Sequence, residues 1–252
     1  MKTVIVLLSL FIPVCCFAFE INPYQESKES CLNLVFCPIN YQEEKIFTED
    51  LAAITSRLKK TAPFKDFSGR ISFFRLDISP EEQKRFFQEN PGIPPFKIRL
   101  DLVNRISDSL KSAYKLVFLD AKGGISCAEL SDISKVSLII LGRSRYGSAD
   151  SFTKGFLHEL GHSLGLRDEG LNSEAAFCLP GPPNCAVTEE EASNWWGNLK
   201  DSIPRVHYIR GCCGNRNYIR PTIASLMNDP DKADDFGPVN ERYLRQVLSQ
   251  TP

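Results

Sequence analysis

The sequence predicts an α+β fold, in which a mixed sheet with helices comes first and a smaller, irregular, disulfide-containing lobe ending in a helix follows. Between residues 32 and 141, short apolar runs alternate with segments of helical spacing, which favours a sheet covered by helices. Residues 170–221 are instead rich in proline, glycine, asparagine and cysteine and show little periodicity. We therefore expect one domain with an upper lobe over about 31–166 and a lower lobe over about 167–252.

Four strands are expected in the upper lobe, each from a short run of apolar or β-branched residues. The runs are 32–36, 70–77, 115–119 and 136–141. Apolar residues at helical spacing predict three helices between them, which are 48–60 with Thr48 as its cap, 80–88 with Pro80 in its first turn, and 100–113. Stretch 90–96 is expected to be a loop, and 142–147 a polar turn.

Two more helices are expected further along the chain. The first covers about 151–164, with Ser151 or Asp150 as its N-cap. The second covers about 239–249, and its predicted buried stripe is Tyr243, Leu244, Val247 and Leu248. Two acidic groups are expected to be solvated rather than to bind metal. They are the helix start at 189–191 and the turn that carries Asp229, Asp231, Asp234 and Asp235.

Residues 1–18 are expected to be a secretory signal peptide. One lysine precedes an apolar run, and the small-residue spacing near Ala18 suits cleavage there. The run contains Pro13 and lacks a basic flank, which disfavours a transmembrane anchor. We expect the mature chain, residues 19–252, to be exported, either secreted or periplasmic, and to be free of the membrane after cleavage. Whether residues 19–30 form a pro-segment is left open.

The charge balance limits the classes of partner. Acidic and basic residues nearly cancel, with a formal net charge of -1 at pH 7. Proteins that bind nucleic acids or membrane surfaces usually carry a basic excess, so we expect neither partner. No internal repeat is visible in the sequence, and we expect a monomer.

Cysteine pairing is expected because disulfides are the default in an exported protein. Two of the nine cysteines, Cys15 and Cys16, fall in the signal segment, which leaves seven. The expected pairs are Cys31 with Cys37, Cys178 with Cys185, and Cys127 with either Cys212 or Cys213. One odd thiol remains.

Residues 158–168 carry the strongest chemical signal, and read His-Glu-Leu-Gly-His-Ser-Leu-Gly-Leu-Arg-Asp. His158 and His162 are four residues apart, so on a helix both imidazoles face one metal. Glu159 is placed to take a proton from a metal-bound water. Gly165 suits a helix end, after which the chain can return Asp168 as a third ligand. Three protein ligands leave a fourth position open, which is typical of catalytic zinc (Zn2+).

This motif resembles that of the IgA-peptidase family of secreted bacterial zinc metallopeptidases and of metzincin-like enzymes more broadly. Other segments similar to that family are 34–36, 145–147, 218–227 and 236–240. The resemblance implies a metzincin-like fold with zinc on the two histidines and Asp168, Glu159 as general base, and Met227 in a turn beneath the metal. Members of the family often have one more residue before the aspartate, which leaves Glu169 as the alternative third ligand.

Four residues outside the motif are weighed for a role at the metal. Met227 is one of only two methionines, and it follows Ser225 in an apolar stretch, which adds weight to a structural turn below the imidazoles. Tyr146, Tyr218 and His207 are candidate hydrogen-bond donors to the transition state. His207 is the only histidine outside the motif, and a partly exposed structural histidine is the alternative interpretation.

The function predicted from these residues is that of a secreted zinc metalloendopeptidase, a hydrolase that cleaves a polypeptide substrate with zinc-activated water. The substrate is expected to lie extended beside the strand 136–141 by strand addition. The alternative is a catalytically silent zinc-binding exported protein that acts as a binding module. Glu159 favours the enzyme, since a pure metal scaffold needs no base. The substrate and its cleavage preference do not follow from the sequence.

Overall fold

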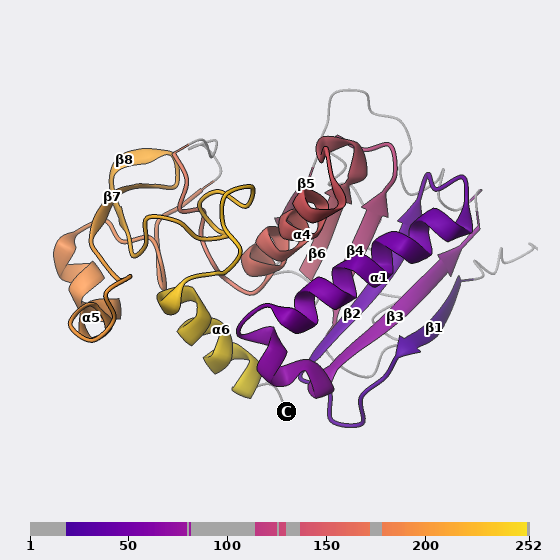
Figure 1. Cartoon of the computed structure of the whole chain (residues 1–252), viewed down its shortest axis with the longest axis horizontal. Coiled ribbons are helices and arrows are strands. Elements are labelled where there is room, and N and C mark those ends of the chain that lie inside the picture. The colour runs from indigo at the N-terminus through magenta and orange to yellow at the C-terminus, as the bar shows by residue number, and fades with distance from the viewer. Residues whose placement is uncertain are drawn as a thin grey trace, which may run out of the picture.

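The computed structural model describes residues 19–79, 81, 114–124, 126–129, 137–171 and 178–250. The signal segment 1–18, the helices predicted over 80–88 and 100–113, and the loop 90–96 lie outside these residues apart from position 81. Figure 1 shows the sheet and its helices on one side of the molecule and the C-terminal segments on the other. Among the described residues, no helix combines the length and apolar character needed to cross a membrane.

The upper lobe is built on a six-stranded mixed sheet with the strand order β1-β3-β2-β4-β6-β5. The strands are β1 (Phe19–Gln25), β2 (Leu32–Ile39), β3 (Ile71–Ile78), β4 (Lys115–Asp120), β5 (Ser126–Glu129) and β6 (Ser137–Gly142). β3, β2, β4 and β6 run parallel, and the two edge strands, β1 and β5, are antiparallel to their neighbours. The four predicted strands are confirmed with small shifts of their ends, whereas β1 and β5 were not predicted.

Residues 19–25 bear on the pro-segment question. They form β1 and pair with β3 from Phe19 to Gln25. The segment is therefore an edge strand of the sheet in the full chain.

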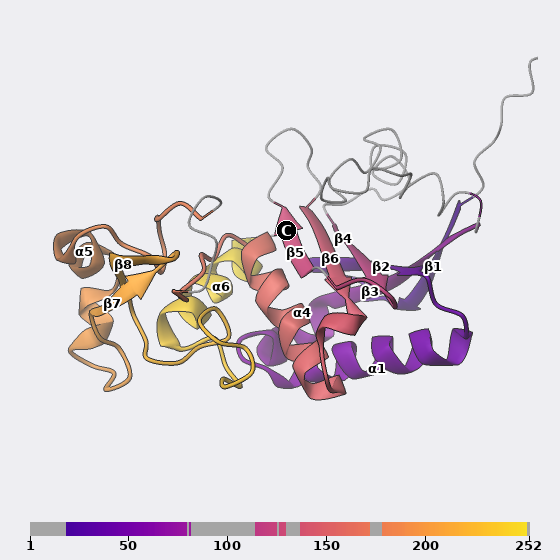
Figure 2. The same ribbon diagram turned by 90° about the horizontal axis from the view of Figure 1, so that it is seen from above.

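Two helices cover one face of the sheet (Figure 2). α1 (Glu44–Lys60) starts before the predicted Thr48, whose hydroxyl donates instead to the Glu44 carbonyl within the helix. α4 (Ala149–Ser163) starts before the predicted residue 151, because Ser148 is its N-cap and accepts a hydrogen bond from the Ser151 amide. The predicted caps Thr48, Ser151 and Asp150 are therefore wrong, although the helices themselves are confirmed.

The core of the upper lobe follows the alternation of side chains along each strand. Leu34 and Phe36 of β2 point toward α1 and α4, and Val35 and Cys37 point to the opposite face. All four are fully buried. Burial of such a side chain contributes about 1.5–3 kcal/mol, so the sheet and α4 form one apolar unit.

The lower lobe is more regular than predicted. It contains α5 (Glu189–Lys200), the hairpin of β7 (Ile209–Cys212) and β8 (Asn215–Arg220), and α6 (Pro238–Gln250). α5 begins at the acidic run because the Thr188 hydroxyl accepts from the Glu191 amide and the Glu191 carboxylate accepts from the Val187 amide. The helix start expected at 189–191 is confirmed, whereas the prediction that the rest of 170–221 is irregular is wrong for the described hairpin, since hairpin geometry outweighs composition.

The last helix buries a different stripe from the predicted one. Leu244 and Leu248 are buried as expected, but Val239 and Asn240 complete the buried face. Tyr243 and Val247 pack only partly against the core.

The predicted disulfide pairing is wrong at every pair. The bonds join Cys178 with Cys213 and Cys185 with Cys212. Cys31 directly precedes β2 and Cys37 lies within it, and six residues of extended chain span about 20 Å, which is far beyond the reach of a disulfide. Cys127 lies on the edge strand β5, outside both disulfides.

Candidate metal centre

α4 supplies two imidazoles from one face. His158 and His162 are four residues apart, and their Nε2 atoms lie 3.0 Å from each other. The opposite face of the helix carries Phe152, Phe156 and Leu160, which are fully buried. Because these three side chains pack into the sheet lobe, the rotation of α4 is fixed and both imidazoles point away from the core.

A tight turn at the end of α4 returns the chain to the histidines. The Gly165 amide donates to the His162 carbonyl and the Leu166 amide to the Gly161 carbonyl, which is the Schellman pattern of a helix C-terminus. Gly165 has a φ of 104°, a conformation that favours glycine. Asp168 then approaches the histidines, with Oδ1 3.4 Å from each Nε2 atom.

The three ligand atoms form a triangle that fits a zinc ion. Its edges are 3.0, 3.4 and 3.4 Å. Tetrahedral zinc with bonds of about 2.0–2.1 Å requires ligand atoms about 3.3–3.4 Å apart. The side chains of His158, His162 and Asp168 are 17%, 21% and 27% exposed, so solvent reaches the triangle. The donor set and its spacing therefore suit a metal with one position left for water.

Hydrogen bonds at the far side of each ring set the histidine tautomers. Nδ1 of His158 lies 2.7 Å from the Leu226 carbonyl oxygen, and Nδ1 of His162 lies 3.0 Å from the Leu166 carbonyl oxygen. A carbonyl oxygen accepts only, so each Nδ1 carries a proton and donates it. Both Nε2 lone pairs are then available for a metal.

The electrostatics of the group favour a cation. Burial by itself lowers the pKa of His158, but the hydrogen bond to Asp168 and the charges of Glu159 and Asp168 raise that pKa to about 9. Burial raises the pKa of Asp168, but the hydrogen bonds from His158 and His162 hold that pKa well below its usual range. Without a metal, His158 therefore binds a proton more tightly than a free imidazole does, next to the Asp168 carboxylate.

Glu159 lies beside the triangle rather than in it. Its side chain is 6% exposed, and it interacts electrostatically with both histidines and with Asp168. Burial raises the pKa of Glu159, while His158 and His162 act to lower it. A buried carboxylate with a raised pKa is suited to accept a proton and release it again.

Glu169, the alternative third ligand, does not join the group. Its side chain is fully buried, and both oxygens accept hydrogen bonds from other residues. The donors are the Ser225 hydroxyl at 2.6 Å, the Asn240 amide at 2.8 Å, the Asn184 amide at 3.0 Å and the Thr222 hydroxyl at 3.2 Å. With all four acceptor positions used, Glu169 connects the ligand loop to the rest of the lower lobe, and Asp168 is the residue that lies at the histidines.

Met227 lies against the zinc-motif helix. It is fully buried, and a Cβ added at Gly161 would come within 2.5 Å of its Sδ atom. It sits in a tight turn, because the Ser225 carbonyl accepts from the amides of Asn228 and Asp229. The preceding residue, Leu226, provides the carbonyl that holds His158. The turn that contains Met227 therefore supports the imidazoles from the lower lobe.

The three candidate transition-state donors are in different surroundings. Tyr146 packs against Gly155 on α4, and its electrostatic neighbours include Glu159. Burial raises the pKa of Tyr146, while a hydrogen bond with Ser126 lowers it. Tyr218 lies on β8 against the disulfide cysteines, and His207 is exposed, with its backbone bonded to Pro221 and Trp196. The structure thus brings only Tyr146 of these three toward the general-base candidate, within the described residues.

The predicted substrate strand is wrong. The strand β6, which corresponds to 136–141, pairs with β4 on one side and with β5 on the other, so both of its edges are occupied. β5 is the edge strand of the sheet on this side. It packs beside α4.

The acidic turn forms ion pairs rather than a metal site. Asp229 pairs with Lys232, and Asp235 with Arg205. Asp234 pairs with both Arg57 of α1 and Lys154 of α4, which ties this turn to the upper lobe. Three of its four aspartates thus have a cationic partner.

Comparisons with known proteins give little beyond this geometry. No protein-family model matches the chain, and no curated protein matches it. Among solved structures, the chain is similar to the crystal structure of archaemetzincin from Methanopyrus kandleri, with 10% sequence identity and a TM-score of 0.39. The similarity covers 87% of this chain and 96% of that chain. At this level the likeness supports no argument, and nothing here supports membership of the IgA-peptidase family.

Sequence reasoning missed the residues that support the centre from a distance. Asn184, Ser225 and Asn240 hold the Glu169 carboxylate, and Arg220 donates to its backbone carbonyl at 2.8 Å. They lie 15 to 71 positions away in the sequence. Only the placement of an acidic residue directly after Asp168 could have suggested such a role.

Proposed function

We propose that this chain is a zinc metallopeptidase of metzincin-like type. The observation that carries the proposal is the triangle of His158, His162 and Asp168, with edges that match tetrahedral zinc and with the buried Glu159 beside it. A structural zinc site is closed by four protein ligands, whereas here three partly exposed ligands leave room for water.

The chain's own residues have separate tasks in peptide hydrolysis. His158, His162 and Asp168 would hold a zinc ion, which would supply Lewis acidity toward the scissile carbonyl and the attacking water. Glu159 takes the proton from the attacking water and passes it to the leaving amine. The carbonyls of Leu226 and Leu166 keep both imidazoles in the tautomer that leaves Nε2 free. Tyr146 is the candidate donor to the developing oxyanion.

The proposal also covers export, domain organisation and oligomeric state. Residues 1–18 are proposed to direct export, and residues 19–252 to form one catalytic domain that acts as a monomer, either secreted or periplasmic. Two disulfides are consistent with an oxidising compartment. Membership of the IgA-peptidase family is a narrower hypothesis that rests on the resemblance of the motif and of the segments 34–36, 145–147, 218–227 and 236–240.

A silent zinc-binding module is the second candidate. It needs the ligand triangle but not Glu159, which is buried against that triangle at the cost of desolvating a carboxyl group. A carboxyl group retained at such a position favours the enzyme.

The test is cleavage of a mixed peptide library by the full chain without its signal segment. Cleavage is expected with zinc-loaded protein, to be lost after dialysis against a chelator, and to return when zinc is added back. Mass spectrometry of the products identifies the bonds cut. A protein that holds zinc stoichiometrically but leaves the library intact is the binding module and not the peptidase.

A further inference from the structure

The ligand loop is held along its backbone by the β7–β8 hairpin. Three consecutive carbonyls, those of residues 168, 169 and 170, each accept one hydrogen bond from it. The Cys213 amide donates to Asp168 at 3.0 Å, and the Gly214 amide donates to Gly170 at 3.0 Å. Between them, Nη1 of Arg220 donates to Glu169 at 2.8 Å. Each of residues 168–170 is therefore bonded to the hairpin through its backbone carbonyl, beginning with the proposed zinc ligand Asp168.

A second segment holds the same loop from its other end. The Asn184 side chain bonds to both backbone groups of Arg167, accepting from its amide and donating to its carbonyl, each at 2.9 Å. The same amide group also donates to the Glu169 carboxylate at 3.0 Å. The residue after Asn184 is Cys185, which is bonded to Cys212 of the hairpin. The hairpin and this segment thus enclose residues 167–170 and are covalently joined.

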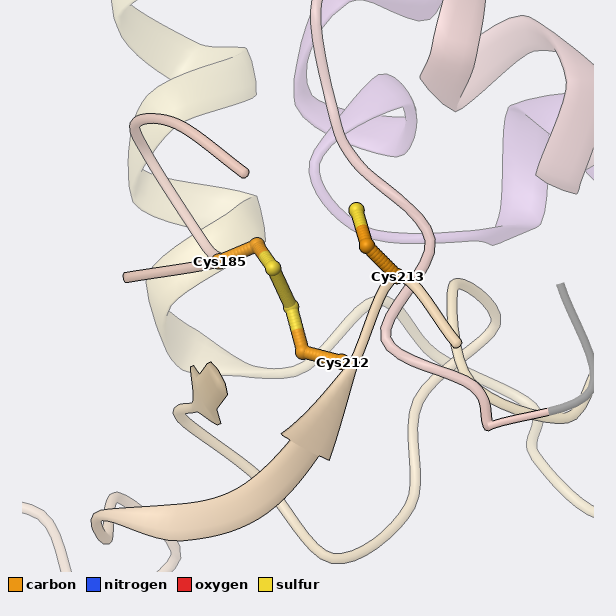
Figure 3. Close-up of side chains that lie close together, drawn as sticks. All are labelled: Cys185, Cys212 and Cys213. Carbon is orange, nitrogen blue, oxygen red and sulfur yellow. A yellow bond between two sulfur atoms is a disulfide. The ribbon is translucent and has the colours of Figure 1, made fainter. Parts of the chain in front are cut away.

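The hairpin turn explains how two adjacent cysteines reach different partners. Cys213 and Gly214 are the two turn residues, with φ of 48° and 67°, and a two-residue hairpin turn of type I′ requires positive φ at both positions. Cys212 is still in the strand, so its side chain points to the face where Cys185 lies, while Cys213 projects in another direction (Figure 3). Cys213 bonds instead to Cys178.

We propose that the two disulfides form a clamp that positions Asp168, so that tight zinc binding requires both bonds. The cystine clamp consists of Cys178, Cys185, Cys212 and Cys213, and the inference rests on the proposed metal centre. The four cysteines are positioning residues, because Cys213 and the neighbour of Cys185 hold the backbone around the ligand while none of the four belongs to the ligand triangle.

The clamp makes the metal centre dependent on oxidation. For each bond, two thiols give up two protons and two electrons to an external disulfide, which is released as two thiols while the new S–S bond forms. Before this exchange, the hairpin and the segment at residue 185 are joined by noncovalent contacts alone, among them the backbone hydrogen bonds and apolar packing between Ala186 and Ile219. In a reducing compartment the chain would thus carry the two histidines of α4 but a loosely held third ligand, and the centre would complete itself after export.

The test is a double-mutant cycle on zinc affinity in the full chain without its signal segment. One arm removes a disulfide with Cys178→Ser/Cys213→Ser or with Cys185→Ser/Cys212→Ser. The other arm removes the ligand with Asp168→Ala, and the cycle is closed by the combined variants. Zinc dissociation constants are measured by competition with a chromophoric chelator, and Co2+ absorption spectra report the coordination geometry. Cys37→Ala removes a buried sulfur from the upper lobe and is the matched control.

We expect each disulfide variant to weaken zinc binding by about 10- to 100-fold, the range for changes that disturb the support of a metal ligand. In the Asp168→Ala background the same variants should cause no further loss, and Cys37→Ala should keep the wild-type affinity. Arg220→Met, which keeps both disulfides and removes one loop contact, should give a smaller loss even if the disulfide variants fail to fold.

Two results overturn the clamp. One is unchanged zinc affinity in the disulfide variants and in Arg220→Met, and the other is an equal loss with and without Asp168. Measurements of zinc binding and peptide cleavage on the wild-type protein separate the clamp proposal from the peptidase proposal. If it binds zinc with the predicted cycle but cuts no peptide, the clamp stands and the peptidase proposal fails. If it binds no zinc, both fail.

Discussion

The upper and lower lobes hold their parts of the proposed centre by different forces. In the upper lobe, α4 lies on the sheet through fully buried side chains such as Phe152, Phe156 and Leu160, and it presents His158 and His162. In the lower lobe, Asp168 lies on a loop that is held by backbone hydrogen bonds, by the buried Glu169 carboxylate and by two disulfides. Two ligands depend on apolar packing, and the third depends on polar and covalent contacts.

This difference predicts how substitutions in each half of the centre should affect zinc binding and activity. Apolar packing is non-directional and tolerates small shifts, whereas a hydrogen-bonded loop loses its geometry when one partner is removed. Replacement of Glu159 on α4 should therefore reduce activity without unfolding the protein. Replacement of residues around Asp168 should mainly weaken zinc binding.

The largest effect is expected from Glu159→Gln. The amide cannot take a proton from water, while the helix packing and the three ligands stay in place. We expect kcat/KM for a cleaved peptide to fall by about 10²- to 10⁴-fold, the usual contribution of a general base. Zinc content by mass spectrometry should equal that of wild type. Unchanged peptide cleavage in this variant would show that another group is the base.

The second-largest effect is expected from Asp168→Ala, and it is compared with substitution of the neighbouring Glu169. Asp168→Ala should weaken zinc binding by more than the roughly 10- to 100-fold that a change in a supporting residue causes, because it removes a ligand. Glu169→Gln should cost folding stability, since its amide nitrogen would face donors that now bond to a carboxylate oxygen, a loss of about 1–3 kcal/mol, and should weaken zinc binding less than Asp168→Ala does. Urea unfolding and zinc titration of both variants distinguish the two roles. The opposite pattern would make Glu169 the ligand.

The third effect tests the contact between α4 and the turn below it. In Gly161→Ala, the new Cβ would lie 2.5 Å from Met227 Sδ and 3.0 Å from Phe236. Overpacking costs about 1–3 kcal/mol, and the gain in helix propensity returns up to about 1 kcal/mol. We expect a net loss of stability in thermal unfolding together with weaker zinc binding. Gly69→Ala is the control, because no atom lies within 4 Å of its added Cβ.

The smallest effect concerns the pH dependence of stability at the C-terminal end of α4. Lys115 donates to the Ser163 carbonyl at 2.7 Å, and burial lowers its pKa from 10.5 to about 8. A lowered folded-state pKa means that the folded form binds the proton less tightly than the unfolded form. The stability contribution of Lys115 is thus greatest above pH 10.5 and declines as the pH falls toward 8.

Relative to Lys115→Met, the wild-type protein should therefore gain stability when unfolding is measured at pH 10 instead of pH 7. The zinc-free protein is used for both, so that metal loss does not contribute. A stability difference between the two proteins that stays constant with pH would contradict the lowered pKa.

The comparison between the lobes also explains what the sequence could predict. His158, Glu159 and His162 follow from helical spacing, and Gly165 with Asp168 follows from a local helix-ending motif. Strands made of continuous apolar runs were likewise predicted. All of these signals involve residues close together in the sequence.

The remaining features depend on distant partners. The disulfides join residues 35 and 27 positions apart, and their pairing is set by a two-residue hairpin turn that the composition does not reveal. Edge strands β1 and β5 were missed because they are short or polar, and their existence depends on pairing with a neighbour. The lower lobe was thus harder to predict, because the contacts that hold it join residues far apart in the sequence.

Zinc K-edge X-ray absorption of the purified, zinc-loaded protein tests the central assignment most directly. Two candidate metal groups exist among the described residues, and they differ in chemistry: His158, His162 and Asp168 offer nitrogen and oxygen, whereas Cys185, Cys212 and Cys213 would offer sulfur only with their disulfides reduced. The assignment predicts a shell of nitrogen and oxygen atoms only, at about 2.0–2.1 Å, with imidazole scattering from two histidines. A sulfur shell at about 2.3 Å would place the metal at the cysteines and contradict the proposed active site.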